Sequence, residues 1–202
     1  MRTSSALAGL TAVGLVYSTW CGAVLAQWIL SAEVGADRFW GGSIETTAEQ
    51  RSFRPYRPTT LGVGLERRDG RLGVGLRLRY ASAGLALEGT DALSAVKGVF
   101  SVYTVSPEAT YRIATVGSGN QLMLHGGPLF EVWSVVDENS QTRVGVQGAM
   151  SFDVPLGGRF AGSVTAGAAV IPSPFGQGQL DPTFERRALW RRRFAVGLSY
   201  RM

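Results

Sequence analysis

Histidine is the side chain best suited to general acid–base chemistry near neutral pH, and the sequence contains one, His125. Glu131 falls on the same side of the same alternating segment, so these two residues are the best catalytic candidates in the chain. A serine–histidine–acid site also needs a geometry that sequence cannot specify. His125 is followed by Gly126-Gly127-Pro128 rather than by a His-x-Ser-Asn-like motif. We therefore expect a hydrogen-bonded interior histidine and assign no catalytic residue.

Carboxylates and arginines occur in equal numbers on one side of the alternating segments. A charge buried without a partner costs several kcal/mol, so charges that share a narrow interior must neutralise one another. The sequence therefore predicts an internal network of ion pairs, and a polar conduit or narrow gated pore is the alternative. The predicted members are Glu33, Asp37, Glu66, Glu108, Glu131 and Asp153 with Arg77, Arg79, Arg112, Arg191, Arg193 and Arg201.

Metal and cofactor chemistry has little support in the composition. The single cysteine, Cys21, excludes an internal disulfide and any multi-cysteine zinc or iron–sulfur site. The single histidine excludes histidine-pair metal sites and the HExxH motif. We therefore expect no metal and no cofactor.

The elements that position these residues are β-strands, because apolar and polar residues alternate with a period of two. In 71–81, every second residue from Leu72 to Tyr80 is apolar or aromatic, and arginine, glycine and alanine fill the positions between. No helical segment separates the strands. The eight predicted strands are 28–40, 61–66, 71–81, 99–115, 121–136, 143–154, 159–171 and 190–202.

The connections between these strands are of two kinds. Tight turns are predicted at 68–71, 117–120 and 156–159, and mostly longer loops at 41–58, 88–98 and 172–189. An up-and-down meander with two unlike ends is the form of bacterial outer-membrane barrels, which have short periplasmic turns and longer outer loops. The longer loops are the candidate contact points for an extracellular ligand.

Small residues and aromatic residues indicate which face of each strand meets lipid. Glycine and alanine are frequent on the polar face, where a narrow eight-stranded interior needs room for long charged side chains. Aromatic residues near the strand ends belong at membrane–water interfaces. A soluble lipocalin-like barrel, with its apolar face inward, explains neither feature. The predicted aromatic girdle is Trp28, Trp40, Phe152, Phe160, Trp190 and Tyr200.

The first residues have the form of a secretory signal peptide. Met1-Arg2 is positively charged, residues 6–19 carry no charge, and Val24-Leu25-Ala26 fits a small-x-small cleavage site. Trp20 before Cys21 argues against a lipoprotein, whose attachment box needs a small residue there. We expect a cleaved signal peptide at 1–26 and a barrel at 27–202.

The whole pattern of 27–202 resembles the small eight-stranded outer-membrane barrel proteins of the OmpA/OmpX-type architecture. Gly197, Tyr200 and Met202 are similar to the C-terminal signal that the barrel-assembly machinery reads, although that family usually ends in phenylalanine. The resemblance implies an all-β, eight-stranded antiparallel up-and-down transmembrane barrel in the outer membrane of a Gram-negative bacterium. A structural or surface-interaction role is expected.

The resemblance also implies the partners and the competing functions. Expected partners are outer-membrane lipids, lipopolysaccharide and, during insertion, the barrel-assembly machinery. The arginine clusters at 186–187 and 191–193 are not expected to bind nucleic acid; their exposed members should meet lipopolysaccharide phosphates. The alternatives are a lipid A-modifying barrel enzyme that uses His125 and a porin-like narrow pore.

Overall fold

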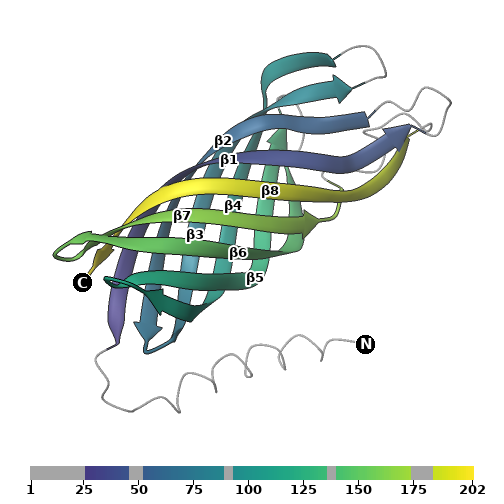
Figure 1. The fold of residues 1–202 in the computed structure, drawn as a ribbon. Coiled ribbons are helices and arrows are strands. Elements are labelled where there is room, and N and C mark those ends of the chain that lie inside the picture. The colour runs from purple at the N-terminus through teal and green to yellow at the C-terminus, as the bar shows by residue number, and fades with distance from the viewer. Residues whose placement is uncertain (1–25, 46–51, 89–92, 136–139, 174–183) are drawn as a thin grey trace, which may run out of the picture.

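The computed structural model describes residues 26–45, 52–88, 93–135, 140–173 and 184–202. Its strands form one closed barrel in which sequence neighbours pair antiparallel and β8 pairs with β1 (Figure 1). Within the described part of the chain, no helix is long and apolar enough to cross a membrane. The strands are β1 (Gln27–Glu45), β2 (Ser52–Asp69), β3 (Leu72–Glu88), β4 (Leu93–Val116), β5 (Asn120–Val135), β6 (Gln141–Gly157), β7 (Phe160–Ile171) and β8 (Phe184–Arg201).

The two ends of the barrel differ as the sequence predicts. The three tight turns lie at one end, and each contains a glycine with positive φ, namely Gly70 at 58°, Gly117 at 57° and Gly158 at 55°. The start of β1 and the end of β8 lie at this same end (Figure 1). In outer-membrane barrels the short turns are periplasmic. We therefore call this end periplasmic and the opposite end extracellular.

The strand register fixes the width of the interior. Cross-strand partners followed once around the barrel from Trp28 lead through Val74, Gly126 and Arg192 back to β1 at Arg38, ten residues along the strand. An offset of this size requires the strands to tilt by about 35–45° from the barrel axis. Eight strands with this tilt enclose a space just wide enough for side chains to fill.

The strands extend further than predicted into the three longer loops. β2 occupies 52–58 and pairs with β3, β4 occupies 93–98, and β8 occupies 184–189. The pairing between β1 and β2 stops at Ala36 and Thr59, so the preceding part of β2 has a free edge on the side of β1. Pro55 and Pro58 lie there, where a backbone N–H donor is not needed. Local sequence hid these extensions because they lack clean alternation. Residues 1–25 of the predicted signal peptide lie outside the described residues.

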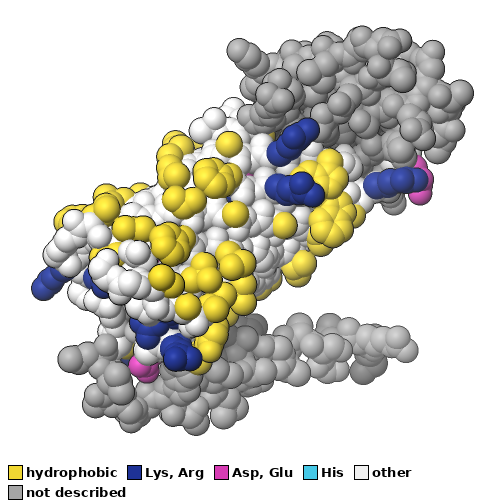
Figure 2. Space-filling view, viewed as in Figure 1, with side chains coloured by type: hydrophobic (Ala, Val, Ile, Leu, Met, Phe, Trp, Pro, Cys, Tyr) yellow, Lys and Arg dark blue, Asp and Glu magenta, His cyan; other side chains and the backbone are white. Residues whose placement is uncertain are grey.

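The two faces of the barrel wall are chemically opposite. On β3, Leu76 and Leu78 are 46% and 45% exposed on the outside, whereas Arg79, between Leu78 and Tyr80, is 7% exposed inside. Hydrophobic side chains cover much of the outer wall in Figure 2, with basic side chains toward its ends. The wall therefore presents an apolar band to lipid and a charged face to the lumen.

Candidate functional site

The lumen is the most elaborate side-chain cluster of the described protein. Alternation turns every second residue inward, and the tilted register stacks inward residues from different strands into layers along the barrel axis. The ion pairs form a central layer, an extracellular layer and a periplasmic layer. Most of the predicted network members take part, and each layer combines strands that are distant in the sequence.

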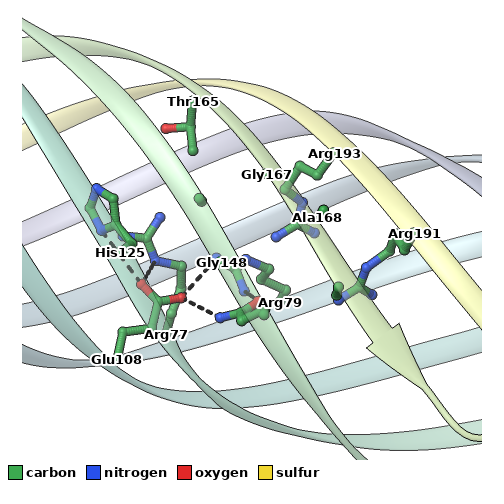
Figure 3. A pocket seen from close by; sticks show the side chains of 13 residues that line it. Arg77, Arg79, Glu108, His125, Gly148, Thr165, Gly167, Ala168, Arg191 and Arg193 are labelled. Atoms are coloured by element: carbon green, nitrogen blue, oxygen red, sulfur yellow. Dashed lines mark hydrogen bonds and ion pairs between the residues drawn. The ribbon is translucent and has the colours of Figure 1, made fainter.

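The central layer consists of two acids and two arginines. Glu33 on β1 accepts from Arg77 Nη1 at 2.6 Å and from Arg79 Nε at 2.8 Å. Glu108 on β4 lies 3.3 Å from Arg77 Nε and accepts from Arg79 Nη2 at 3.0 Å. Gln147 on β6 donates to Glu108 at 2.7 Å. Figure 3 shows Glu108 between the two guanidinium groups, which leaves no charge of this layer without a counter-charge.

The extracellular layer is the most deeply buried. The Glu131 side chain is fully buried and accepts from Arg191 Nη1 at 2.5 Å and from the Trp133 indole at 3.0 Å. Arg193 donates to Asp37 through Nε at 3.0 Å and Nη2 at 3.3 Å. These contacts join β1, β5 and β8 across the lumen. The acids are thus neutralised where water has least access.

The periplasmic layer uses an arginine that sequence reasoning missed. Arg68 Nε donates to Glu66 at 2.8 Å, and its Nη1 donates to Gln121 at 3.2 Å. Thr110 also donates to Glu66, at 2.8 Å. The prediction placed Arg68 in the turn, but β2 continues to Asp69 and keeps its alternation, so Arg68 points inward like Glu66. Extending the phase of 61–66 by two residues would have found it.

Three predicted network members have no ion pair among the described residues. Asp153 accepts from Ser151 at 2.9 Å, and no carboxylate of the described residues forms an ion pair with Arg112 or Arg201. All three are partly exposed near the periplasmic mouth, where β4 and β6 approach their turns and β8 ends. Water can solvate charges at that position, so they need no protein partner.

His125 and Glu131, the two catalytic candidates on the inward face of β5, have different partners in the structure. His125 Nε2 lies 2.9 Å from Ser151 Oγ, and the Ser151 hydroxyl donates to Asp153. Because that hydroxyl has one hydrogen, the histidine must donate through Nε2–H. Its Nδ1 is buried without a hydrogen bond in the described protein, 3.8 Å from Glu108 Oε2.

This histidine–serine–acid contact faces the lumen and not the membrane. His125 is 8% exposed and Ser151 4% exposed, and the barrel wall separates both from lipid. The arrangement fits the expected interior hydrogen-bonded histidine. It gives no support to a lipid-modifying role, because an acyl chain on the outer wall cannot reach either side chain.

The cavities between the layers are small. One of about 20 Å³ lies among Arg79, Glu108 and Gln147, and another of about 40 Å³ lies below it beside Ser151 and Arg201. A single water needs about 10–15 Å³ measured in this way. The central part of the lumen therefore has room for isolated waters and not for a continuous aqueous column.

Inward glycines create the space for the network. A Cβ on Gly62 would lie 2.8 Å from Glu33 Cγ and 3.2 Å from Arg79 Cγ. A Cβ on Gly197 would lie 2.8 Å from Ser163 Oγ and 2.9 Å from the Ala32 carbonyl oxygen. Strand glycines otherwise weaken a sheet. Gly62 is explained by the long charged side chains beside it, and Gly197 by the close approach of the Ser163 hydroxyl and the Ala32 backbone.

The predicted aromatic residues all lie on the outer wall and form two belts. Trp28, Phe160 and Tyr200 lie near the periplasmic end, with Phe152 slightly deeper. Trp40 and Trp190 are cross-strand partners near the extracellular end. Such belts belong at the two interfaces of a membrane. Of the predicted assembly-signal residues, Tyr200 lies on the outer face at the periplasmic end of β8, Met202 follows that strand, and Gly197 faces inward.

Comparison with solved structures identifies the architecture. Neisserial surface protein A superposes with a TM-score of 0.54 at 11% identity, covering 86% of this chain and 96% of that one. The outer membrane protein OprG from Pseudomonas aeruginosa superposes with a TM-score of 0.54 at 13% identity, covering 88% and 96%. The chain has the fold of the small eight-stranded outer-membrane barrels.

This fold confirms the predicted all-β, eight-stranded antiparallel barrel, and the neighbours agree with the predicted bacterial outer-membrane localisation. No protein-family model matches the chain, and no curated protein matches its sequence. The similarity is therefore one of architecture at low sequence identity.

Proposed function

We propose that this outer-membrane barrel is closed to ions and acts through its outer surfaces, in a structural or surface-interaction role. The observation that carries the proposal is the central layer, in which Glu33, Glu108, Arg77 and Arg79 bridge the lumen. The cavity beside this layer has room only for isolated waters. A permeating ion would have to break several short charge-assisted hydrogen bonds at once.

The test compares conductance with stability. Purified wild-type barrel in planar bilayers should give no channel openings under a moderate applied potential. Glu108→Ala should destabilise the folded barrel and open a leak, because it removes one of the two carboxylates that neutralise Arg77 and Arg79. Stable single-channel steps in the wild type, with unchanged stability of Glu108→Ala, would instead support the gated pore.

The proposal includes a route to the membrane. Residues 1–26 are removed as a signal peptide, and Gly197, Tyr200 and Met202 form the signal read by the barrel-assembly machinery. Mass spectrometry of the outer-membrane form should give an N-terminus at Gln27. An intact Met1–Ala26 segment in the inserted protein would refute this part. Tyr200→Ala should slow assembly. Phe160 is an exposed aromatic residue on β7, and Phe160→Ala, the matched control, should leave the assembly rate unchanged.

The surface role has two sets of contacts. Lipids, with lipopolysaccharide in the outer leaflet, meet the apolar wall and its belts. An extracellular ligand would meet the connections that follow β1, β3 and β7. Binding of surface ligands should survive substitutions in the lumen that leave the barrel folded, since the two regions lie on opposite sides of the wall.

A further inference from the structure

Two arginines lie side by side on the lipid-facing wall, and no described residue supplies a counter-charge. Arg38 on β1 and Arg192 on β8 are direct cross-strand partners, and both are exposed. No carboxylate of the described residues lies within ion-pair distance of either one. Like charges directly opposite one another destabilise a sheet. Arg187, higher on β8, is different because its Nη2 lies 3.2 Å from Glu185.

The depth of this pair corresponds to a headgroup region. Both residues lie two positions inside the extracellular Trp40–Trp190 pair. With a rise of about 3.3 Å per residue and a tilt near 45°, their Cα atoms lie about 5 Å inside the belt. Arginine side chains of that depth extend to the interface. The Arg192 guanidinium already lies 4.6 Å from the centre of the Trp40 ring.

The outer wall around the two arginines is apolar, and some of its side chains are small. Ala168 on β7 is the cross-strand partner of Arg192, and Ala36 on β1 lies one outward position below Arg38. Phe194 is the outward residue below Arg192. Figure 2 shows basic side chains bordered by hydrophobic ones on the wall over β1 and β8. A ligand that suits this place combines an anionic group with acyl chains.

We propose that Arg38 and Arg192 form a phosphate site for the phosphorylated glycolipid of the outer leaflet, the lipid A part of lipopolysaccharide. This assignment rests on the proposed surface role in the outer membrane. Two guanidinium forks present parallel N–H donors that match phosphate oxygens, and a bound phosphate removes their mutual repulsion. The acyl chains then lie along Phe194 and the alanines below. Low local polarity strengthens the charge interaction relative to bulk water.

The periplasmic belt provides an internal contrast. Arg67 on β2 is also exposed beside a belt tryptophan, with its guanidinium 6.0 Å from the Trp28 ring centre. Its cross-strand partners are Trp28 and Val74, so no second cation faces it. One arginine beside an aromatic ring suits many interfacial positions. The adjacent pair occurs on the extracellular side, where the glycolipid carries its phosphates.

The experiment measures lipid binding to the full-length mature barrel in maltoside detergent, which contains no phosphate. Native mass spectrometry compares bisphosphorylated lipid A with lipid A from which both phosphates have been removed. The wild type should bind the bisphosphorylated form at least tenfold more tightly. Arg38→Gln and Arg192→Gln should each reduce that affinity about tenfold, the loss expected for one charge-assisted contact. Arg67→Gln and Arg187→Gln should leave it unchanged.

Several results would overturn the site. One is equal affinity for the two forms of lipid A, and another is a wild-type affinity in the Arg38→Gln/Arg192→Gln double variant. A third is an equal loss of affinity in Arg67→Gln, which would indicate general attraction between a basic protein and an anionic lipid. Displacement of the lipid by millimolar inorganic phosphate would also overturn it, because a lipid held by acyl chains should resist. Gel mobility of unboiled samples checks folding, and if the glutamine variants unfold, Arg38→Lys and Arg192→Lys should still weaken binding by loss of the fork. A barrel that does not conduct ions and does not bind lipid A would refute this site alone. A barrel that conducts ions and binds lipid A would refute the closed lumen alone.

Discussion

Neighbouring residues on one strand meet opposite surroundings in this protein. Arg77 and Arg79 on β3 are held by carboxylates inside the barrel, while Leu76 and Leu78 between and beside them face outward. On the inner face, each buried charge is paired with a counter-charge. The outer face is stable in lipid because it carries almost no charge. This difference is the one expected of a barrel wall that has lipid outside and charged side chains packed inside.

The largest expected effect comes from breaking the central layer. Glu108→Ala should lower the free energy of unfolding in lipid vesicles by about 3–5 kcal/mol, because Arg77 and Arg79 then share the single carboxylate Glu33. Adding Arg79→Met should recover much of the loss by restoring charge balance. Denaturant titrations of the two variants measure both effects, and a double variant as unstable as Glu108→Ala would contradict the network.

The outer face should respond to a charge almost as strongly. Leu76→Arg places an unpaired guanidinium near the middle of the apolar band and should cost about 2–4 kcal/mol. Tyr111, exposed near the periplasmic end, is the matched position, and Tyr111→Arg should cost no more than about 1 kcal/mol. Equal unfolding energies for the two variants would mean that Leu76 does not face the bilayer core.

Glycine substitutions separate the crowded inner face from the open outer face. A Cβ on inward Gly75 would lie 2.8 Å from the Leu65 carbonyl oxygen, so Gly75→Ala should cost about 1–3 kcal/mol. A Cβ on outward Gly148 would have the His125 carbonyl oxygen as its nearest neighbour, at 3.9 Å. Gly148→Ala should therefore be nearly neutral in the same unfolding assay. A loss of stability at Gly148 and none at Gly75 would reverse the assigned faces.

The smallest effect is expected at the periplasmic mouth. Asp153 has Ser151 as its hydrogen-bond donor and is partly exposed, so Asp153→Asn should change the unfolding energy by less than about 1 kcal/mol. Glu131→Gln, in the buried extracellular layer beside Arg191, should cost several times more. Similar losses of stability in the two variants would show that water has no better access to the periplasmic mouth than to the buried extracellular layer.

Periodicity in the sequence was enough to predict which face of a strand each residue occupies. Glu33, Arg79 and Glu108 were correctly placed inside because side-chain direction in a strand is a local property with a period of two. The same rule explains the failure at Arg68, where the turn was assigned too early and the phase was not carried on. The strand extensions at 52–58 and 184–189 were missed because pairing with a neighbour, not alternation, holds them.

Partner choice in the lumen was beyond the sequence. Arg193 meets Asp37 and Arg191 meets Glu131 although these residues come from opposite parts of the chain. His125 was placed on the inward face of its strand, but its contact with Ser151 on β6 could not be read from the sequence. A pairing of this kind depends on the register between strands and on the ten-residue offset at closure, which no single segment encodes.

The sequence by itself therefore determined the number of strands, their faces, the two unlike ends and the apolar band, because each follows from local alternation and turn chemistry. The tertiary structure decided which carboxylate neutralises which arginine and that Arg38 and Arg192 meet on the outer wall. It also decided that Arg112 and Arg201 reach the mouth without an ion pair to any described residue. Those outcomes arise when a tilted sheet closes on itself and brings the last strand against the first.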